Sequence, residues 1–335
     1  MHLRRHRGAK AWNTATTGSV GRIVGRFTEP VLSVLDLAIV SGGATEREAL
    51  EGSVALARCA EALGFERIWY AEHHNMGSIA SSATSVLIAH VAANTDTIRL
   101  GSGGIMLPNH SPLVIAEQFG TLATLHPGRI DLGLGRAPGT DQVTVRALRR
   151  DPAAAEHFPQ DVLELQGYLR GESIVAGVKA VPGAGTNVPI YILGSSLFGA
   201  QLAAELGLPY GFASHFAPEA LTRAVALYRE RFKPSEQLDE PYVVAGVNVI
   251  AADTDDQAET ERQAVLRARV ARFLAGDREL TEDQVDQLVA SHQGRQVAAM
   301  MTYSAVGSPA SVRRYLEEFT RHADADELML SPASR

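Results

Sequence analysis

The chain has 335 residues, of which 45% are hydrophobic, 21% are charged and one is a cysteine. This is the composition of an ordinary globular protein, and it excludes a collagen-like, coiled-coil or wholly disordered chain. A single cysteine, Cys59, excludes an intramolecular disulfide and a cysteine-rich metal site, so we expect a reducing, cytoplasmic location.

The charge is unevenly distributed along the chain. Residues 1–30 carry a formal charge of +5, whereas residues 31–335 carry −12. We therefore predict a disordered basic leader over 1–30 and one acidic domain over 31–335 that binds no nucleic acid. The apolar run Leu32–Val40 is interrupted by Asp36 and is shorter than the roughly 20 residues needed to cross a bilayer, so we expect no membrane association.

From Val31 onward, short apolar runs alternate with longer segments of helical periodicity, a pattern typical of βα units on a parallel sheet. Eight such runs predict a closed (β/α)8 TIM barrel. The predicted strands are Leu32–Val40, Arg67–Ala71, Ile98–Met106, Ile130–Leu134, Ile190–Gly194, Tyr210–Ser214, Tyr242–Ile250 and Glu327–Leu330.

Helix start signals lie between these runs. Thr45 with Glu48, and Thr281 with Gln284, have the spacing of capping boxes, and Gly64 follows the first helical pattern as a C-terminal cap. Three prolines also stand where a first helical turn accepts them, in the pairs Ser111-Pro112, Ala217-Pro218 and Ser308-Pro309. Each of these signals predicts the start of a helix.

Two connections are too long to be simple loops, because most loops have about 4–6 residues. They are residues 135–189, after the fourth strand, and residues 251–326, after the seventh. We predict helical insertions at both places. The second contains two helical patterns, around Gln257–Leu274 and Gln284–Ser291, on either side of Gly276.

Several common motifs are absent or incomplete. The chain contains no phosphate-binding P-loop and no G-x-S-x-G nucleophile elbow. Residues 133–139 resemble a dinucleotide-binding fingerprint, but the third glycine is one position late and Pro138 interrupts the turn. His73 and His74 are adjacent and should point to opposite sides of an extended segment, so we predict no metal site.

The unusual residues share one location, the carboxyl ends of predicted strands, which form the active face of a (β/α)8 barrel. A histidine there can exchange a proton near neutral pH, paired glycines let a flat ligand approach the backbone, and an arginine with serines suits a phosphate. Together they predict a phosphorylated planar cofactor. The residues are Glu72, His73, His74, Gly103, Gly104, Arg136, Gly194, Ser195 and Ser196.

Each of these residues also has a purely structural interpretation. Ser195 and Ser196 could cap a helix, Arg136 could form a surface ion pair, and the histidines and glycines could serve turns. For any one of them alone the structural interpretation is the better one. Their common position on one rim favours a functional site.

The chain resembles the bacterial luciferase-like family of flavin-dependent monooxygenases over nearly its whole length from about Val31. The resemblance rests on four segments in the family's order. These are Gly64–Trp69 running into Glu72-His73-His74, then Ile98–Pro108, His126–Arg136 and Ile192–Ala204.

The resemblance implies a role for each rim residue. His73 matches the histidine associated with catalysis beside the flavin ring, and Gly103-Gly104 matches a cis peptide bond under that ring. Arg136, with Ser195 and Ser196, matches the phosphate site, and Glu72, His74 and Gly194 belong to the same cofactor-binding segments. Gly199 is a departure, because relatives often have a hydroxyl residue there.

The resemblance further implies a cofactor and partners. We expect reduced FMN, supplied by a separate flavin reductase, to react with dioxygen and a small organic substrate, and we expect a homodimer. A deazaflavin-dependent reductase or dehydrogenase remains an alternative with the same fold. A flavin-binding protein without catalysis and, more remotely, a metal-dependent barrel hydrolase also stay open.

Overall fold

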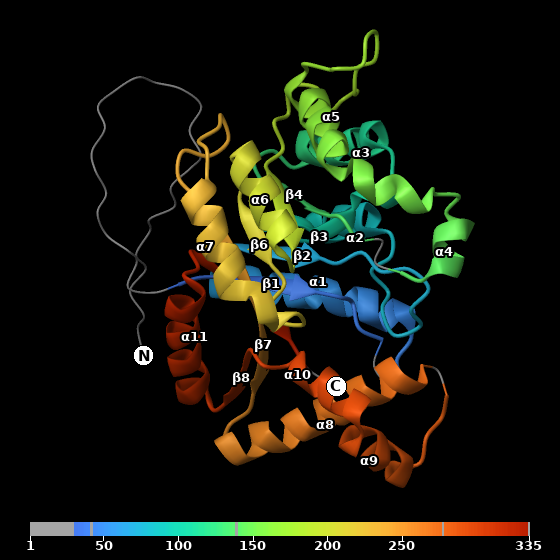
Figure 1. Cartoon of the computed structure of the whole chain (residues 1–335), viewed down its shortest axis with the longest axis vertical. Helices are drawn as coiled ribbons and strands as arrows, with labels where there is room; N and C mark the ends of the chain where they lie inside the picture. The colour runs from blue at the N-terminus through green and yellow to red at the C-terminus, as the bar shows by residue number, and fades with distance from the viewer. Residues whose placement is uncertain (1–29, 41–42, 138–139, 277, 334–335) are drawn as a thin grey trace.

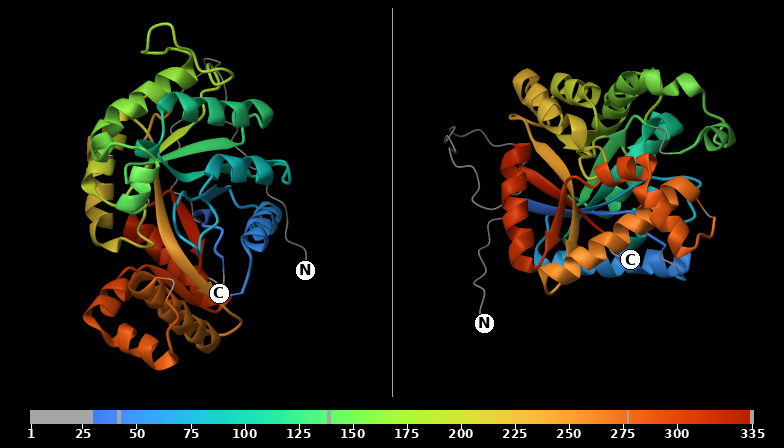
Figure 2. Two further views of the ribbon diagram at one scale, coloured as in Figure 1. Left: turned by 90° about the vertical axis from the view of Figure 1, so that its right-hand side faces the viewer. Right: turned by 60° about the horizontal axis from the view of Figure 1, so that its bottom comes forward.

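The computed structural model describes residues 30–40, 43–137, 140–276 and 278–333. The predicted leader, residues 1–30, therefore lies almost entirely outside the described residues. Eight parallel strands form a closed ring in the order β1, β2, β3, β4, β5, β6, β7 and β9, in which β6 pairs with β7 and β9 pairs with β1 (Figures 1 and 2). The predicted (β/α)8 barrel is confirmed.

The strands agree closely with the apolar runs of the sequence. Leu32–Val40 is shortened at its end, because Ala38 adopts a φ of 48° and its amide donates to the Asp36 carboxylate at 2.8 Å. The observed strands are β1 Val31–Asp36, β2 Arg67–Tyr70, β3 Arg99–Met106, β4 Ile130–Gly135, β5 Ile190–Gly194, β6 Tyr210–Phe212, β7 Val243–Ala251 and β9 Glu327–Pro332.

The helices surround the ring (Figure 1). Both predicted capping boxes are present, at Thr45 and Thr281. Pro112 and Pro309 begin α-helices as predicted, whereas Pro218 begins a 3-10 turn, Pro218–Ala220, directly before an α-helix. The helices that alternate with the barrel strands are α1 Glu46–Leu63, α2 Thr84–Ala92, α3 Pro112–Leu125, α5 Phe158–Arg170, α6 Leu197–Leu206, α7 Leu221–Arg231 and α11 Pro309–Ala323.

Both predicted insertions contain helices. After β4 the chain forms α4, Gln142–Ala147, and a 3-10 helix, Pro152–His157, before α5. After β7 it forms α8 Asp255–Ala275, α9 Glu282–Ala290 and α10 His292–Ala299, which lie together at one edge of the molecule (Figure 1). This insertion also contains a short strand, β8 Ser304–Gly307. It pairs with the last residues of β7, whereas β6 pairs with the first residues of β7. Neither α10 nor β8 was predicted.

The inside of the barrel has a buried polar layer near the amino ends of the strands. The Arg67 guanidinium contacts Asp131 at 2.7 Å and Glu327 at 2.9 Å, and both carboxylates are fully buried. Burial alone would raise the pKa of Asp131, but Arg67 and Arg99 lower it below its usual value. Apolar side chains fill the next layer toward the carboxyl ends, among them Leu35, Trp69, Val244 and Met329. The core is therefore packed, and a ligand site must lie at the mouth of the barrel.

Candidate active site

A buried glutamate organises the mouth of the barrel. Glu72 follows β2 and is 1% exposed. Its carboxylate accepts hydrogen bonds from His74 Nε2 at 2.9 Å, His110 Nε2 at 2.8 Å and the Met106 amide at 3.0 Å, with a longer contact of 3.4 Å from Asn109. Glu72 thereby ties the end of β2 to the end of β3 and to the turn that follows it.

The charges of this cluster depend on one another. Burial of Glu72 favours its neutral form, but the hydrogen bonds from His110 and His74 outweigh burial and lower its pKa to about 2. The hydrogen bond to Glu72 in turn raises the pKa of His74 above its usual value. At neutral pH, Glu72 is an anion with an associated histidine that holds its proton more tightly than a free imidazole does.

His73 lies between Glu72 and His74 in the chain and interacts with a third histidine, His215. Its amide donates to the Ser81 carbonyl at 3.3 Å, which fixes the backbone after β2. His73 is close enough to His215, which follows β6, to lower the pKa of that histidine. Burial is the main cause of the shift, and the pKa of His215 falls to about 4. Two histidines that follow separate strands thus interact electrostatically.

The paired glycines of β3 are surrounded on both sides. The Gly103–Gly104 peptide bond is cis, at the position that the resemblance implied. A Cβ atom on Gly103 would lie 2.7 Å from Leu35 Cδ1, and one on Gly104 would lie 2.7 Å from both the Gly133 carbonyl oxygen and Leu193 Cδ1. Side chains therefore do not fit here, and the backbone itself is what β3 can present to a flat ligand.

Arg136 and the two serines meet at the start of α6. Arg136 follows β4, and its Cζ lies 4.2 Å from the centroid of the Phe198 ring, in the first turn of that helix. Ser196 is the N-cap residue, yet its side chain makes no capping hydrogen bond. An exposed guanidinium, a hydroxyl not used for capping and the amide groups of a helix N-terminus fit a phosphate. The structure thus brings together the predicted phosphate-binding residues.

The glycine at position 199 has a structural cause. A Cβ atom on Gly199 would lie 3.3 Å from Cε2 of Tyr210, a buried tyrosine of β6. The Tyr210 hydroxyl donates to the Ser196 carbonyl at 3.0 Å. A side chain at 199 would therefore crowd the Tyr210 ring, which would have to shift by a few tenths of an ångström, and the same tyrosine supports the backbone of the proposed phosphate site.

The insertion after β4 is attached to the same rim. Thr140 donates from its hydroxyl to the His74 carbonyl at 3.0 Å, and Asn75 donates from its side chain to Asp141 at 2.9 Å. Asp141 also caps α4, accepting from two amides at its start. The first turn of α4 is thus held against the loop that carries the histidines.

Two members of this site were not predicted from the sequence, His110 and His215. Each stands just after a predicted strand, His215 directly after Tyr210–Ser214 and His110 four residues after Met106. The position rule that selected His73 would also have found His215. His110 is displaced from the strand end by the 3-10 turn Leu107–Asn109, which no sequence signal placed at the rim.

Glu72, His74 and His110 also form a group whose ligand atoms lie within 4.8 Å of one another, as in a metal site. The same carboxylate already accepts a backbone amide and two ring N–H groups. These contacts suit a hydrogen-bonded network that positions side chains.

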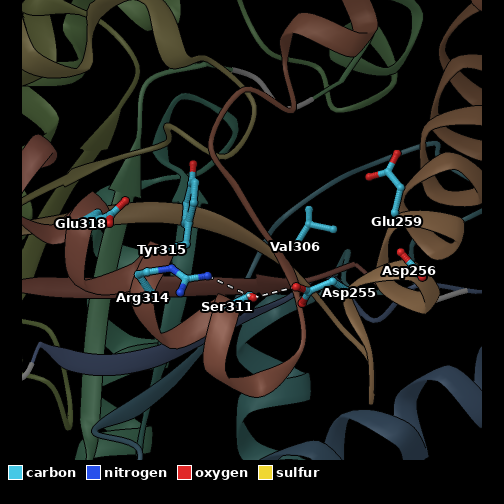
Figure 3. Close-up of a pocket in the computed structure, with 8 residues that line it drawn as sticks. All are labelled: Asp255, Asp256, Glu259, Val306, Ser311, Arg314, Tyr315 and Glu318. Atoms are coloured by element: carbon cyan, nitrogen blue, oxygen red, sulfur yellow. Dashed lines mark hydrogen bonds between the residues drawn. The ribbon is translucent and has the colours of Figure 1, made fainter.

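A separate hollow of about 490 Å³ lies between the start of α8, β8 and α11 (Figure 3). Its walls carry the acidic residues Asp255, Asp256, Glu259 and Glu318. Asp255 accepts from the Ser308 amide and from the Ser311 hydroxyl, so it ties α8 to the start of α11. Its acidic lining is unsuited to a flavin phosphate, and none of the predicted site residues lines it.

No helix in the described ranges combines the length and apolar character needed to cross a membrane.

Comparison with known proteins places this chain in a family. The family model of luciferase-like monooxygenases matches residues 32–325. A luciferase-like monooxygenase of Escherichia coli K12 is 51% identical over 304 residues, which cover 89% of this chain and 90% of the relative. The N-acetyl-S-alkylcysteine monooxygenase of Bacillus subtilis is 37% identical over 235 residues, covering 68% and 70% of the two chains.

Solved structures agree with the sequence relatives. The crystal structure of apo-MsnO8 superposes with a TM-score of 0.80 at 34% identity, over 91% of this chain and 92% of that one. At 16–17% identity, the fold is shared with an F420-dependent secondary alcohol dehydrogenase, TM-score 0.66, and with the oxygenating component of 3,6-diketocamphane monooxygenase in complex with FMN, TM-score 0.65. The fold thus serves both FMN and F420. The chain belongs to the bacterial luciferase-like monooxygenase family.

Proposed function

We propose that this protein is a monooxygenase that uses reduced FMN and dioxygen to oxidise a small organic substrate. The observation that carries the proposal is that the Glu72 histidine network and the Arg136 cluster both follow the carboxyl ends of strands, with the Gly103–Gly104 backbone inside β3, the strand between β2 and β4. Membership of the family and relatives named as monooxygenases at 51% and 37% identity support it.

The residues fit FMN in two separate places. Arg136, Ser195 and Ser196, with the amides of α6, would hold the phosphate, and the backbone at Gly103–Gly104 would lie against the ring. When bound, reduced flavin supplies the electrons that activate dioxygen. F420 remains the alternative cofactor, since the fold accommodates it in other proteins.

The chain's own groups would position the substrate and move protons. His73, half-buried beside the neutral ring of His215, would exchange a proton with the substrate or with bound flavin. Glu72 would hold His74 and His110 and so fix the loops after β2 and β3. The insertion that begins with α4, attached to the His74 loop, would limit the access of water.

We also propose that a separate reductase supplies the reduced flavin, that the protein acts in the cytoplasm, and that it forms a homodimer.

Anaerobic titration with reduced FMN and with reduced F420, followed by exposure to ¹⁸O₂, tests the main proposal. We expect the protein to bind reduced FMN more tightly and to transfer one ¹⁸O atom to a product from a panel of thioethers, aldehydes and ketones. Thioethers are included because one relative is named for an S-alkylcysteine substrate. Preferential binding of F420 with no ¹⁸O in the product would refute the proposal in favour of a dehydrogenase.

A matched pair of variants tests the role of His73. We expect His73→Asn to reduce kcat strongly while leaving reduced-FMN binding within about threefold, since general acid–base groups contribute typically 10²–10⁴-fold to rate. The control is His90→Asn, which changes an exposed histidine on α2. Equal turnover by both variants would remove His73 from the chemistry.

A further inference from the structure

One cation at the barrel mouth has no assigned role. Arg269 lies on α8, in the insertion after β7. Its Nη1 atom is buried and has no hydrogen-bond partner among the described residues, and its Nη2 atom makes only a long contact of 3.4 Å to Asn248 Oδ1. Burial, with the nearby positive charge of Arg272, lowers the pKa of Arg269.

Two other arginines of the same helix, Arg262 and Arg267, have carboxylate partners. Arg262 donates two hydrogen bonds of 2.7 Å to Glu259, and Arg267 forms ion pairs with Glu282 and Asp286. Arg269 has no carboxylate partner in the part of the chain that the structure describes. A buried guanidinium N–H without a partner is costly, and native proteins seldom retain one unless water or a ligand satisfies it.

Arg269 is linked through Asn248 to His215, one of the histidines of the candidate active site. Asn248, fully buried in β7, donates to the His215 carbonyl at 2.7 Å, so the same asparagine contacts Arg269 and fixes the backbone of His215. The His215 ring packs so closely on Gly246 that a Cβ atom there would lie 2.3 Å from Nδ1. Both Arg269 and His73 act electrostatically on His215. Asn248 therefore links Arg269 to the loop that carries His215 at the mouth.

This cation is separate from the residues that fit the flavin phosphate. Arg136 follows β4 and stacks on the first turn of α6, whereas Arg269 contacts the interior of β7. Arg269 is thus a second cation, on a different element from the arginine predicted to bind the flavin phosphate.

We propose that Arg269 binds the carboxylate of the organic substrate, so that this enzyme oxidises a small organic acid held with its reactive part near His73. The inference rests on the proposed function. The guanidinium supplies the charge and an Nη1 donor that lacks a partner, and Asn248 joins it to the backbone of His215, which follows β6 at the mouth. A planar guanidinium suits a carboxylate better than a lysine would.

Isothermal titration of the full chain, with and without FMN, tests this directly. The probes are hexanoate, 3-phenylpropionate and N-acetylmethionine, each compared with its uncharged primary amide. We expect at least one acid to bind about ten- to a hundredfold more tightly than its amide, because hydrogen bonds to charged groups contribute that much. We expect Arg269→Met to abolish the preference and Arg269→Lys to retain part of it.

The control is Arg262→Met, the same change on the same helix at an arginine that is already paired. It should keep the full preference. The inference is overturned if no acid is preferred by the wild-type protein, a comparison that needs no variant to fold, or if the preference survives in Arg269→Met.

The same variants distinguish binding of a substrate carboxylate by Arg269 from binding of the flavin phosphate. If Arg269 instead served the flavin phosphate, Arg269→Met would weaken binding of reduced FMN but not of reduced riboflavin, and this result would also overturn the inference. Binding of acids through Arg269 in a protein that inserts no oxygen would refute the proposed function and leave the carboxylate site standing.

Discussion

Replacing Glu72 by glutamine tests the idea that one buried carboxylate holds the mouth of the barrel together. The variant keeps the shape of the side chain but loses the charge that accepts from His74, His110 and the Met106 amide. The pKa of Glu72 falls from 4.5 to about 2 in the folded protein. At about 1.4 kcal/mol per pH unit, this shift stabilises the folded state by ~3 kcal/mol at neutral pH.

The sign of the pH dependence follows from the lowered pKa. The stabilisation is fully present above the unfolded pKa near 4.5 and is lost as the pH falls toward 2. Urea unfolding of wild type and Glu72→Gln should therefore differ by about 3 kcal/mol at pH 7 and by less than half of that at pH 3.

The matched control is Glu51→Gln, at an exposed glutamate of α1 whose contact to Arg47 is 3.6 Å long. A surface pair of this kind contributes about 0–1 kcal/mol. If Glu72→Gln also lost less than about 1 kcal/mol at pH 7, or if its loss were the same at pH 3, the carboxylate would not be the charged centre described above.

Three other changes test other parts of the structure. Arg67→Met should cost about 3–5 kcal/mol in urea unfolding, because it leaves buried Glu327 without its cation and buried Asp131 with Arg99 alone, and a loss near zero would contradict this. Gly104→Ala should lower the thermal midpoint and weaken reduced-FMN binding, because its Cβ would lie 2.7 Å from a carbonyl oxygen; Gly52→Ala, in open space, should do neither. From pH 7 to pH 4, the free energy of unfolding of the wild type should fall by about 3 kcal/mol relative to that of His215→Gln. The reason is that a histidine with a folded-state pKa of about 4 opposes folding as the pH falls below 6.5. A difference between the two proteins that stays constant with pH would refute this.

Most of the barrel could be predicted because its strands are buried on both faces and read as apolar runs. The missed strand, Ser304–Gly307, has four residues and pairs only with the end of β7, so it leaves no apolar run of strand length. The predicted pattern ends at Ser291, which is both the last cap of the preceding helix and the first cap of the missed helix His292–Ala299, so no gap marks a second helix. Local periodicity cannot separate elements joined in this way.

The candidate site was predictable only where residues follow strand ends. His73 and Arg136 were found by that rule, and His215 obeys it as well. Arg269 could not be found, because it lies within a helix rich in arginines and only the fold shows that its Nη1 atom is buried without a partner. Asn248, which contacts it, lies within the apolar strand β7, and only the fold shows which residues it faces.

The closure of the barrel has a consequence for how the chain is made. β1 pairs with β9, and the Ser33 hydroxyl donates to Glu327 at 2.5 Å across 294 residues of sequence. On the ribosome, the edges of β1 and β7 therefore stay unpaired until β9 has emerged. Exposed edges of this kind invite pairing with other chains. The barrel of the nascent protein can close only once its final strand is synthesised.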